Sequence, residues 1–156
     1  MNYWTSCPSP LGALLLLSDG DALTGLYMDT QTHPPLGEHR PELAVFRQAG
    51  NWLEDYFHGR DAIVSFPLSP AGTEFQKWVW SILLTIPFGQ TRSYGDIARQ
   101  IRPGMSSQAV GGAVGRNPIS IIIPCHRVIG AKGQLTGYAG GLSNKQWLLR
   151  HEEEHK

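Results

Sequence analysis

A cysteine, a histidine and an arginine stand next to one another at Cys125, His126 and Arg127, directly after Pro124. A cysteine thiolate is a nucleophile, an imidazole is a base near neutral pH, and a guanidinium is a permanent cation. A neighbouring positive charge lowers the pKa of a thiol, so Arg127 is expected to favour the thiolate of Cys125. The triplet therefore predicts nucleophilic chemistry at Cys125; the alternative is a small buried cysteine beside a structural histidine.

The apolar run before the triplet is expected to be a buried strand that carries the reactive groups at its end. Four isoleucines and no charged residue occupy positions 119–123, between Pro118 and Pro124. A short β-branched run bounded by proline fits a core strand better than a helix. Adjacent side chains in an extended chain point to opposite faces. Unless the backbone turns between them, Cys125 and His126 are therefore expected to communicate through a bound water and not by direct contact.

A last helix is expected to bring a carboxylate to this triplet. Ser143 and Gln146 have the spacing of a capping box, which predicts the start of the helix. Glu152 lies four residues after Leu148 and three after Leu149, so it is the acidic residue nearest the apolar face. A carboxylate on such a face needs a partner, and a histidine is a suitable one. The alternative is a solvated acidic tail.

Three helices are expected between residues 73 and 116, and the last two of them predict a helix-turn-helix, a motif found in many DNA-binding proteins. Residues 102–105 form the turn of this motif. The apolar positions of the first helix, among them Phe75 and Trp78, are expected to face the core. The helix starts are predicted by polar residues at capping positions, namely Thr73 with Gln76, Ser93 with Asp96, and Ser106.

Glycines are frequent in the third of these helices, at Gly111, Gly112 and Gly115. Glycine weakens a helix and is tolerated where the backbone must come close to a neighbour. That neighbour is either the packed core of the protein or the groove of a bound DNA.

The first part of the chain carries no comparable group of reactive residues. Residues 1–72 are predicted to be a mixed α/β scaffold domain, joined by the proline-rich residues 66–72 to a mostly helical domain at 73–156. Turn residues at 18–21 between two apolar runs indicate a β-hairpin. Within this domain the patterns predict strands at 11–17, 22–28 and 63–66, and a helix at 42–57.

Basic and acidic side chains balance over the whole chain, with 13 of each, but the two halves differ in charge. Residues 1–72 carry three basic and eight acidic residues, a net charge of −5, so the remainder carries +5. A basic half can bind phosphates although the whole chain is neutral. The two cysteines lack metal-ligand spacing, and no apolar run is long enough to span a bilayer. We therefore expect an intracellular protein without a disulfide framework, a metal site or a membrane span.

The hexapeptide from Ile123 to Val128 resembles the active-site signature of the O6-alkylguanine-DNA alkyltransferases. The resemblance runs from about Thr73 to Glu152 and takes in further ordered matches, at 88–89, 93–94, 109–112, 117–118, 137–141 and 147–149. It implies an RNase H-like α/β domain followed by a helical, winged-helix-like domain with the helix-turn-helix. It also implies a single-turnover methylated-DNA–protein-cysteine methyltransferase without a cofactor. In such an enzyme a methyl or other alkyl group moves irreversibly from guanine O6, and from thymine O4, to the cysteine.

The resemblance assigns a role to each matched residue. The implied catalytic residues are Cys125 as acceptor, His126 as base through a water, Glu152 as the holder of the imidazole, Asn117 as the brace of the active-site turn, and Tyr94 as donor to the departing guanine. The implied lining of the guanine pocket is Val128, Tyr138, Ala139 and Gly140. The implied contacts to the minor groove of double-stranded DNA, from which the damaged nucleotide is flipped out, are Tyr94, Ser107, Gln108, Ala109, Gly111, Gly112 and Arg116.

The chain departs from the family pattern at Gln108, where the family has an arginine that fills the space of the extruded nucleotide. Glutamine is shorter, uncharged and a poorer stacking surface than a guanidinium. We therefore expect weaker DNA binding or slower extrusion, with the methyl-transfer chemistry intact. Further expectations are a monomer, with or without cooperative binding along DNA, and a cytoplasmic location, on the nucleoid in a prokaryote.

Two other functions are left open by the residues. A lesion-binding protein without activity, similar to the alkyltransferase-like proteins, agrees with the missing arginine, but those proteins carry tryptophan where Cys125 stands. A cysteine hydrolase is disfavoured because Cys125 and His126 are adjacent and because the chain shows no second convincing triad.

Overall fold

The structure is a computed structural model that describes residues 2–156, and these residues divide into two units. One unit comprises residues 2–71 together with Pro118–Ile122, and the other comprises Gly72–Asn117 together with Ile123–Lys156. The segment Pro118–Ile122 therefore belongs to the first unit, although both of its neighbours in the sequence belong to the second.

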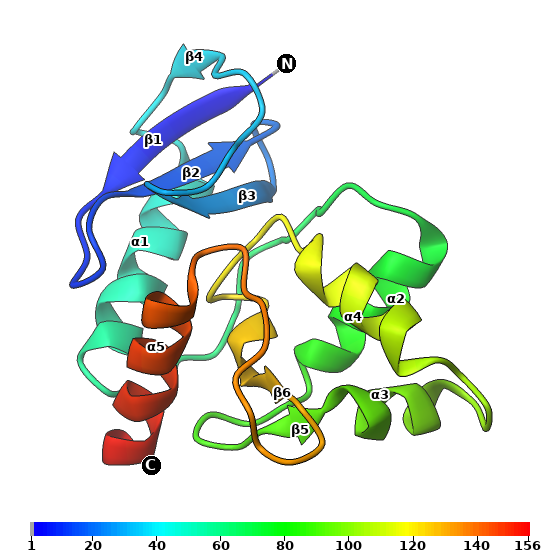
Figure 1. The fold of residues 1–156 in the computed structure, drawn as a ribbon. Coiled ribbons are helices and arrows are strands. Elements are labelled where there is room, and N and C mark those ends of the chain that lie inside the picture. Colours follow the sequence, from blue (N-terminus) through cyan, green and yellow to red (C-terminus); the bar gives the residue numbers. More distant parts are fainter. Residues whose placement is uncertain (1) are drawn as a thin grey trace. The chain divides into compact units, whose positions relative to one another are not determined.

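The first unit is built on a mixed sheet (Figure 1). The β1–β2 and β2–β3 pairs are antiparallel, and β4 pairs in parallel with β1, which gives the order β3-β2-β1-β4. The expected hairpin is confirmed: the Asp19 carboxylate accepts hydrogen bonds from the backbone N–H groups of Asp21 and Ala22, at 3.0 and 2.9 Å, and so closes the turn between β2 and β3. The strands are β1 (Tyr3–Cys7), β2 (Leu14–Ser18), β3 (Leu23–Met28) and β4 (Glu38–His39).

Helix α1 (Ala44–Phe57) packs against β2 and β3 (Figure 1). Its buried residues recur at helical spacing, at Val45, Phe46, Ala49, Trp52, Leu53 and Tyr56, so one face of the helix covers the sheet. Its expected end is confirmed, because Gly59 follows with a φ of 81°, a left-handed conformation that favours glycine.

The expected strand at 63–66 is wrong. These residues have no strand structure, and Ile63 is 84% exposed. Pairing occurs two residues later, where the N–H of Leu23 donates to Pro67 and the N–H of Ser69 donates to Leu23. Prolines at 67 and 70 have no N–H group, so the contact with β3 stays a single bridge.

The expected strand at 119–123 is also wrong, although its burial is confirmed. Ile119 forms one bridge with Leu26 of β3, and the N–H of Ser120 donates to Leu26 at 3.2 Å. The chain then turns, because Ile121 has a φ of 70° and the N–H of Ile122 donates to Ser120 at 2.8 Å. A left-handed φ is costly for a β-branched residue, so this turn is held by its surroundings and not by local preference.

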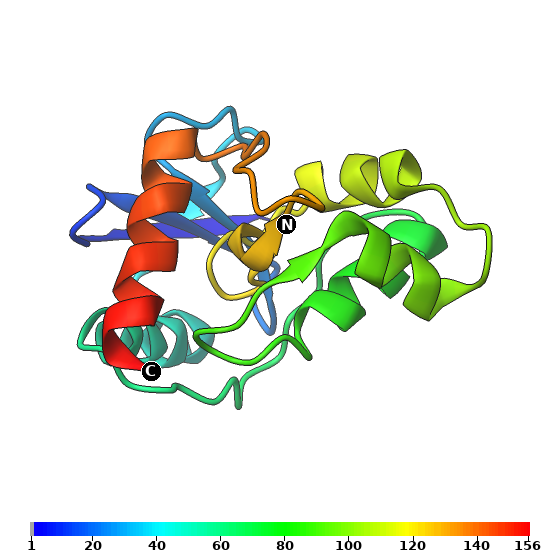
Figure 2. The ribbon, with the colours of Figure 1, turned by 60° about the horizontal axis from the view of Figure 1, so that its bottom comes forward.

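The second unit begins with the three helices α2, α3 and α4, which pack together (Figure 2). The three predicted helix starts are confirmed, since the side chains of Thr73, Ser93 and Ser106 each accept backbone N–H groups of the first turn. The Trp80 indole N–H donates to the carbonyl of Ala113 at 2.8 Å, which ties α2 to α4. The helices are α2 (Glu74–Leu83), α3 (Tyr94–Ile101) and α4 (Ser107–Gly115).

The prediction that Trp78 faces the core is wrong, because this side chain is 52% exposed. The buried face of α2 is formed by Val79, Trp80, Ile82 and Leu83. With two tryptophans close together in a short helix, the apolar pattern alone did not decide which of them faces inward.

The remainder of the second unit positions the triplet and the last helix. A short parallel pair joins β5 (Arg92–Ser93) to β6 (Val128–Ile129), directly after the triplet. Helix α5 (Leu142–His155) starts two residues earlier than expected, and the predicted cap by Ser143 and Gln146 is wrong. Gly141 occupies the capping position with a φ of 95°, and its carbonyl accepts the N–H of Lys145. Among residues 2–156, no helix is long and apolar enough to cross a membrane.

Candidate active site and DNA-binding helix

The reactive triplet forms a tight turn. Residues Cys125–Arg127 are one turn of 3-10 helix, in which the N–H of Arg127 donates to Pro124 and the N–H of Val128 donates to Cys125. The backbone therefore turns between Cys125 and His126, which is the case that the sequence left open, because Pro124 ends the preceding segment. The argument from opposite faces of a strand no longer applies to Cys125 and His126.

Asn117 joins the two ends of the segment that precedes the triplet. Its side-chain N–H donates to the carbonyl of Ile123 at 2.9 Å, and the residue is buried. The same side chain forms a hydrogen bond to Cys125. Asn117 therefore contacts both the backbone that leads into the turn and the thiol that the turn presents.

The thiol of Cys125 is buried, and the groups around it have opposing effects on its pKa. Burial raises its pKa above the ordinary value, while hydrogen bonds from Asn117 and Tyr138 and the charge of Lys145 lower it. Burial is the largest of these effects, so the thiol is on balance harder to ionise than a free cysteine. The cation that lowers its pKa is Lys145 of α5, whereas Arg127 pairs with Glu152.

Lys145 is an almost completely buried lysine, with 1% of its surface exposed. Its ammonium group donates to the carbonyls of Val128, at 2.6 Å, and of Thr136, at 3.3 Å. Burial lowers its pKa, and the nearby Cys125 opposes this shift. The sequence contained a signal for this residue, because Lys145, Leu148 and Glu152 are spaced by three and four positions and so share one face of α5.

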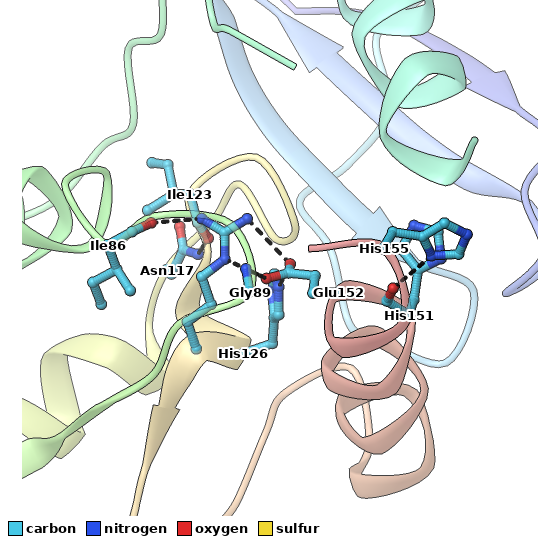
Figure 3. Close-up of polar contacts among 9 residues, drawn as sticks. Ile86, Gly89, Asn117, Ile123, His126, His151, Glu152 and His155 are labelled. Carbon is cyan, nitrogen blue, oxygen red and sulfur yellow. Dashed lines mark hydrogen bonds and ion pairs between the residues drawn. The ribbon is translucent and has the colours of Figure 1, made fainter. Parts of the chain in front are cut away.

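Glu152 is the centre of a buried network (Figure 3). His126 Nε2 lies 2.6 Å from Glu152 Oε2, and these two side chains are 0% and 1% exposed. Arg127 donates through Nε to Oε1 at 2.8 Å and through Nη2 to Oε2 at 3.1 Å. The backbone N–H of Gly89 also donates to Oε1, at 3.0 Å, and Arg127 Nη1 donates to the Ile86 carbonyl at 2.7 Å. The predicted partnership of Glu152 with a histidine is confirmed; its second partner, Arg127, was not foreseen.

These contacts determine the protonation states of Glu152 and His126. Burial disfavours the carboxylate of Glu152, but the hydrogen bonds from His126 and Arg127 and the charge of Arg127 outweigh it and hold its pKa well below the ordinary value. Burial lowers the pKa of His126, and the charges of Arg127 and Lys145 add to this effect against Glu152. An ionised carboxylate only accepts, so Nε2 of neutral His126 carries the proton and Nδ1 carries the lone pair. This tautomer is a base that can take up a proton at Nδ1.

The loop between β6 and α5 contributes the remaining side chains. Tyr138 is half-buried, Ala139 is exposed and Gly140 is buried, while Val128 directly follows the triplet and is buried. Tyr94, the first residue of α3, lies across from this loop, with its hydroxyl 2.7 Å from the Thr136 hydroxyl. Thr136 was not among the expected residues.

The outer face of α4 carries few large side chains. Four of the residues expected to contact DNA on it are exposed, and Arg116 directly after the helix is exposed too, whereas Gly111 is half-buried against Tyr94. A β-carbon added at Gly112 would meet no atom within 4 Å, so the packed core does not explain this glycine. The exposed residues are Ser107, Gln108, Ala109 and Gly112.

Two family models match the chain, one over each of its two parts. The ribonuclease-like domain of 6-O-methylguanine DNA methyltransferase matches residues 2–70, and the DNA-binding domain of the same family matches residues 74–154. The chain belongs to the 6-O-methylguanine DNA methyltransferase family. The predicted RNase H-like domain and the DNA-binding helical domain are thereby confirmed.

Members of the 6-O-methylguanine DNA methyltransferase family resemble this chain over nearly its whole length. A methylated-DNA–protein-cysteine methyltransferase of Mycobacterium leprae is 49% identical over 154 residues, which cover 98% of this chain and 93% of the relative. A protein of the same name from Methanosarcina acetivorans is 46% identical and covers 96% of this chain and 97% of its own length. The crystal structure of Mycobacterium tuberculosis OGT in complex with DNA superposes with a TM-score of 0.90 at 47% identity, over 98% of this chain and 94% of that one.

Proposed function

We propose that this protein is a methylated-DNA–protein-cysteine methyltransferase, which repairs DNA by moving a methyl or other alkyl group from guanine O6 to Cys125. The observation that carries this proposal is the placement of the thiol. Cys125 is buried beside Lys145 and Asn117, and it directly precedes a neutral histidine held by Glu152. The family membership gives this thiol its substrate, because the named relatives are protein-cysteine methyltransferases.

The transfer is a displacement at the alkyl carbon. The proton of the Cys125 thiol passes through a water to Nδ1 of His126, and the resulting imidazolium is stabilised by Glu152. The thiolate attacks, so that the sulfur–carbon bond forms while the bond from carbon to guanine O6 breaks, and the bonding electron pair leaves with the guanine. Tyr94 donates a hydrogen bond to the departing base, and Asn117 keeps the turn in place. Water does not cleave the thioether product, so each molecule reacts once.

DNA contact is assigned to the exposed face of α4 in the minor groove of double-stranded DNA, with the damaged nucleotide flipped into a pocket. Extrusion costs roughly a few kcal/mol. Tyr94 pushes the nucleotide outward, and the base is received by Val128, Tyr138, Ala139 and Gly140. The open space at Gly112 supports close approach of a groove. The DNA-contacting residues are Ser107, Gln108, Ala109, Gly111, Gly112, Arg116 and Tyr94.

The division of labour between the two parts of the chain is a further part of the proposal. Residues 73–156 carry the chemistry and the DNA contacts, and residues 1–72 act as scaffold. The protein acts as a monomer in the cytoplasm, accepts alkyl groups from thymine O4 as well, and needs no cofactor.

The decisive experiment is intact-protein mass spectrometry after incubation with duplex DNA that contains O6-methylguanine. One methyl group is expected per molecule, on the peptide that contains Cys125. Cys125→Ser is expected to abolish the gain in mass, and Cys7→Ser, which removes the other cysteine, to leave it unchanged. Tight binding of the damaged DNA without any gain in mass would contradict the proposal and identify a lesion-binding protein.

A further inference from the structure

Thr136 connects two parts of the second unit that the proposed chemistry uses. It lies in the loop between β6 and α5, and its hydroxyl oxygen is 2.7 Å from the hydroxyl oxygen of Tyr94, which is 42 residues away at the start of α3. Both residues are half-buried. Thr136 thus holds the one polar side-chain atom through which Tyr94 is proposed to act on guanine.

The backbone of the same residue is tied to the lysine beside the thiol. The Thr136 carbonyl accepts a hydrogen bond from Lys145 at 3.3 Å, and the same ammonium group donates to Val128 at 2.6 Å. Lys145 is buried and acts on Cys125 through its charge. The loop therefore meets fixed partners on both sides of Thr136, through its side chain toward α3 and through its backbone toward α5.

The direction of the hydroxyl contact follows from what Tyr94 has to do. Either hydroxyl can donate in the contact between Tyr94 and Thr136. A phenol has a single O–H, so Tyr94 can donate to guanine only when Thr136 is the donor in their mutual hydrogen bond. As guanine departs, the phenol oxygen gains negative charge, and a hydrogen bond donated to it by Thr136 becomes stronger.

We propose that Thr136 is a positioning residue for Tyr94, which orients the phenol O–H toward the departing guanine and stabilises the phenol oxygen during transfer. This inference rests on the proposed function, because it assumes that Tyr94 donates to guanine. It adds a residue outside the proposed catalytic set, and it assigns to the loop a part in aligning the leaving group.

Substitution of Thr136 by valine and by serine distinguishes the contribution of the hydroxyl from that of the rest of the side chain. Thr136→Val keeps the branched shape and the backbone carbonyl that Lys145 contacts, and removes only the hydroxyl. Thr136→Ser keeps the hydroxyl and loses a methyl group. A positioning role predicts that the valine variant is impaired and that the serine variant recovers.

The test is a kinetic double-mutant cycle on methyl transfer from O6-methylguanine in duplex DNA, measured as the second-order rate constant. Thr136→Val is expected to lower the rate constant about tenfold, the usual weight of a hydrogen bond to a group that gains charge. Thr136→Ser is expected to stay within about twofold of the wild type, since the hydroxyl is retained. In a Tyr94→Phe background, Thr136→Val is expected to have almost no further effect, because the group that it positions is gone.

Controls separate this inference from folding and from the proposed function itself. Thr30→Val, at an exposed position of the first unit, serves as the matched threonine substitution. Alkylation of Cys125 by iodoacetamide should be equal in the wild type and in Thr136→Val, since this reaction does not use Tyr94. If Thr136→Val lowers the melting temperature markedly, Thr136→Ala takes its place in the cycle.

The outcomes are distinct. Equal losses from Thr136→Val in the wild-type and Tyr94→Phe backgrounds, or no loss in either, would overturn the positioning role while wild-type transfer upholds the proposed function. A wild-type protein that accepts no methyl group would remove the proposed function, and this inference with it.

Discussion

The network around Glu152 and the outer face of α4 belong to the same unit but differ in burial: the first is enclosed by the protein and the second is exposed. His126, Arg127 and Glu152 are buried, and each side chain is fixed by charged or polar partners. On α4, Gln108 and Gly112 are exposed, and the space beside Gly112 contains no protein atom. The first region completes its contacts inside the protein, and the second has the open surface that the proposed DNA contact requires.

This difference teaches how each region can be damaged. A buried charge that loses its counter-charge is costly, because neither water nor another group replaces it. An exposed helix face tolerates substitution well, and can even gain stability, while losing its fit to DNA. Substitutions in the Glu152 network should therefore lower stability, whereas substitutions on the outer face of α4 should lower DNA affinity and leave stability unchanged or higher.

The largest effect is expected for Glu152→Gln. The amide keeps the shape but leaves Arg127 buried without an anionic partner, and breaking such a pair costs about 3–5 kcal/mol in the free energy of unfolding. Urea unfolding at about pH 7.5 measures this loss, and the transfer rate should fall with it because His126 is no longer held. Glu153→Gln is the matched control: Glu153 is 67% exposed and pairs only with Lys156 among the ion pairs found in residues 2–156, so its loss should be nearly neutral. A Glu152→Gln variant as stable as this control would show that the contacts of Glu152 with Arg127 and His126 do not stabilise the fold.

Lys145→Met tests whether the buried network reaches the thiol. The folded-state pKa of Cys125 is raised by burial and lowered in part by Lys145, so removal of the cation should raise it further. Thiolate forms as the pH rises, so the rate of Cys125 alkylation by iodoacetamide should rise at a higher pH in the variant than in the wild type. At neutral pH a severalfold lower rate is expected. Peptide mass spectrometry separates Cys125 from Cys7, and unchanged pH profiles would place the control of the thiol elsewhere.

Gln108→Arg tests whether the open face lacks a cation. The substitution should strengthen binding to duplex DNA and raise the repair rate, both by about tenfold, since a guanidinium adds charge and a stacking surface. The slope of log affinity against log salt should become more negative by about 1 if the new charge meets a phosphate. Gln48→Arg, on the exposed side of α1, is the matched control for a general gain of charge. Equal gains from both substitutions, or none from Gln108→Arg, would show that this position does not limit binding.

The smallest effect is expected for Gly112→Ala, which gives the sharpest contrast with the buried network. The new methyl group meets no protein atom, so the helix should gain about 0.5–1 kcal/mol of stability while DNA affinity falls severalfold. Gly50→Ala in α1 is matched, because a β-carbon there also has no neighbour within 4 Å. It should stabilise the protein without any effect on DNA binding. If both variants bind DNA as the wild type does, close approach of a groove at Gly112 is excluded.

Features that depend on near neighbours in the chain were predictable from the sequence. The starts of α2, α3 and α4 follow from Thr73, Ser93 and Ser106, because a capping side chain binds N–H groups only two or three residues ahead. The burial of Glu152 and its pairing with a histidine were readable from helical spacing and from the cost of an unpaired buried carboxylate. The family signature around Cys125 supplied the chemistry.

The tertiary structure alone decided which distant groups meet. Residues 118–122 cross into the first unit and turn at Ile121 against its β-branched preference, so local propensity predicted a strand that is not there. Arg127 pairs with Glu152, and the cation beside Cys125 is Lys145, 20 positions further along the chain. Adjacency in the sequence favoured Arg127, but a charge acts over distance in space, and only the folded chain sets that distance.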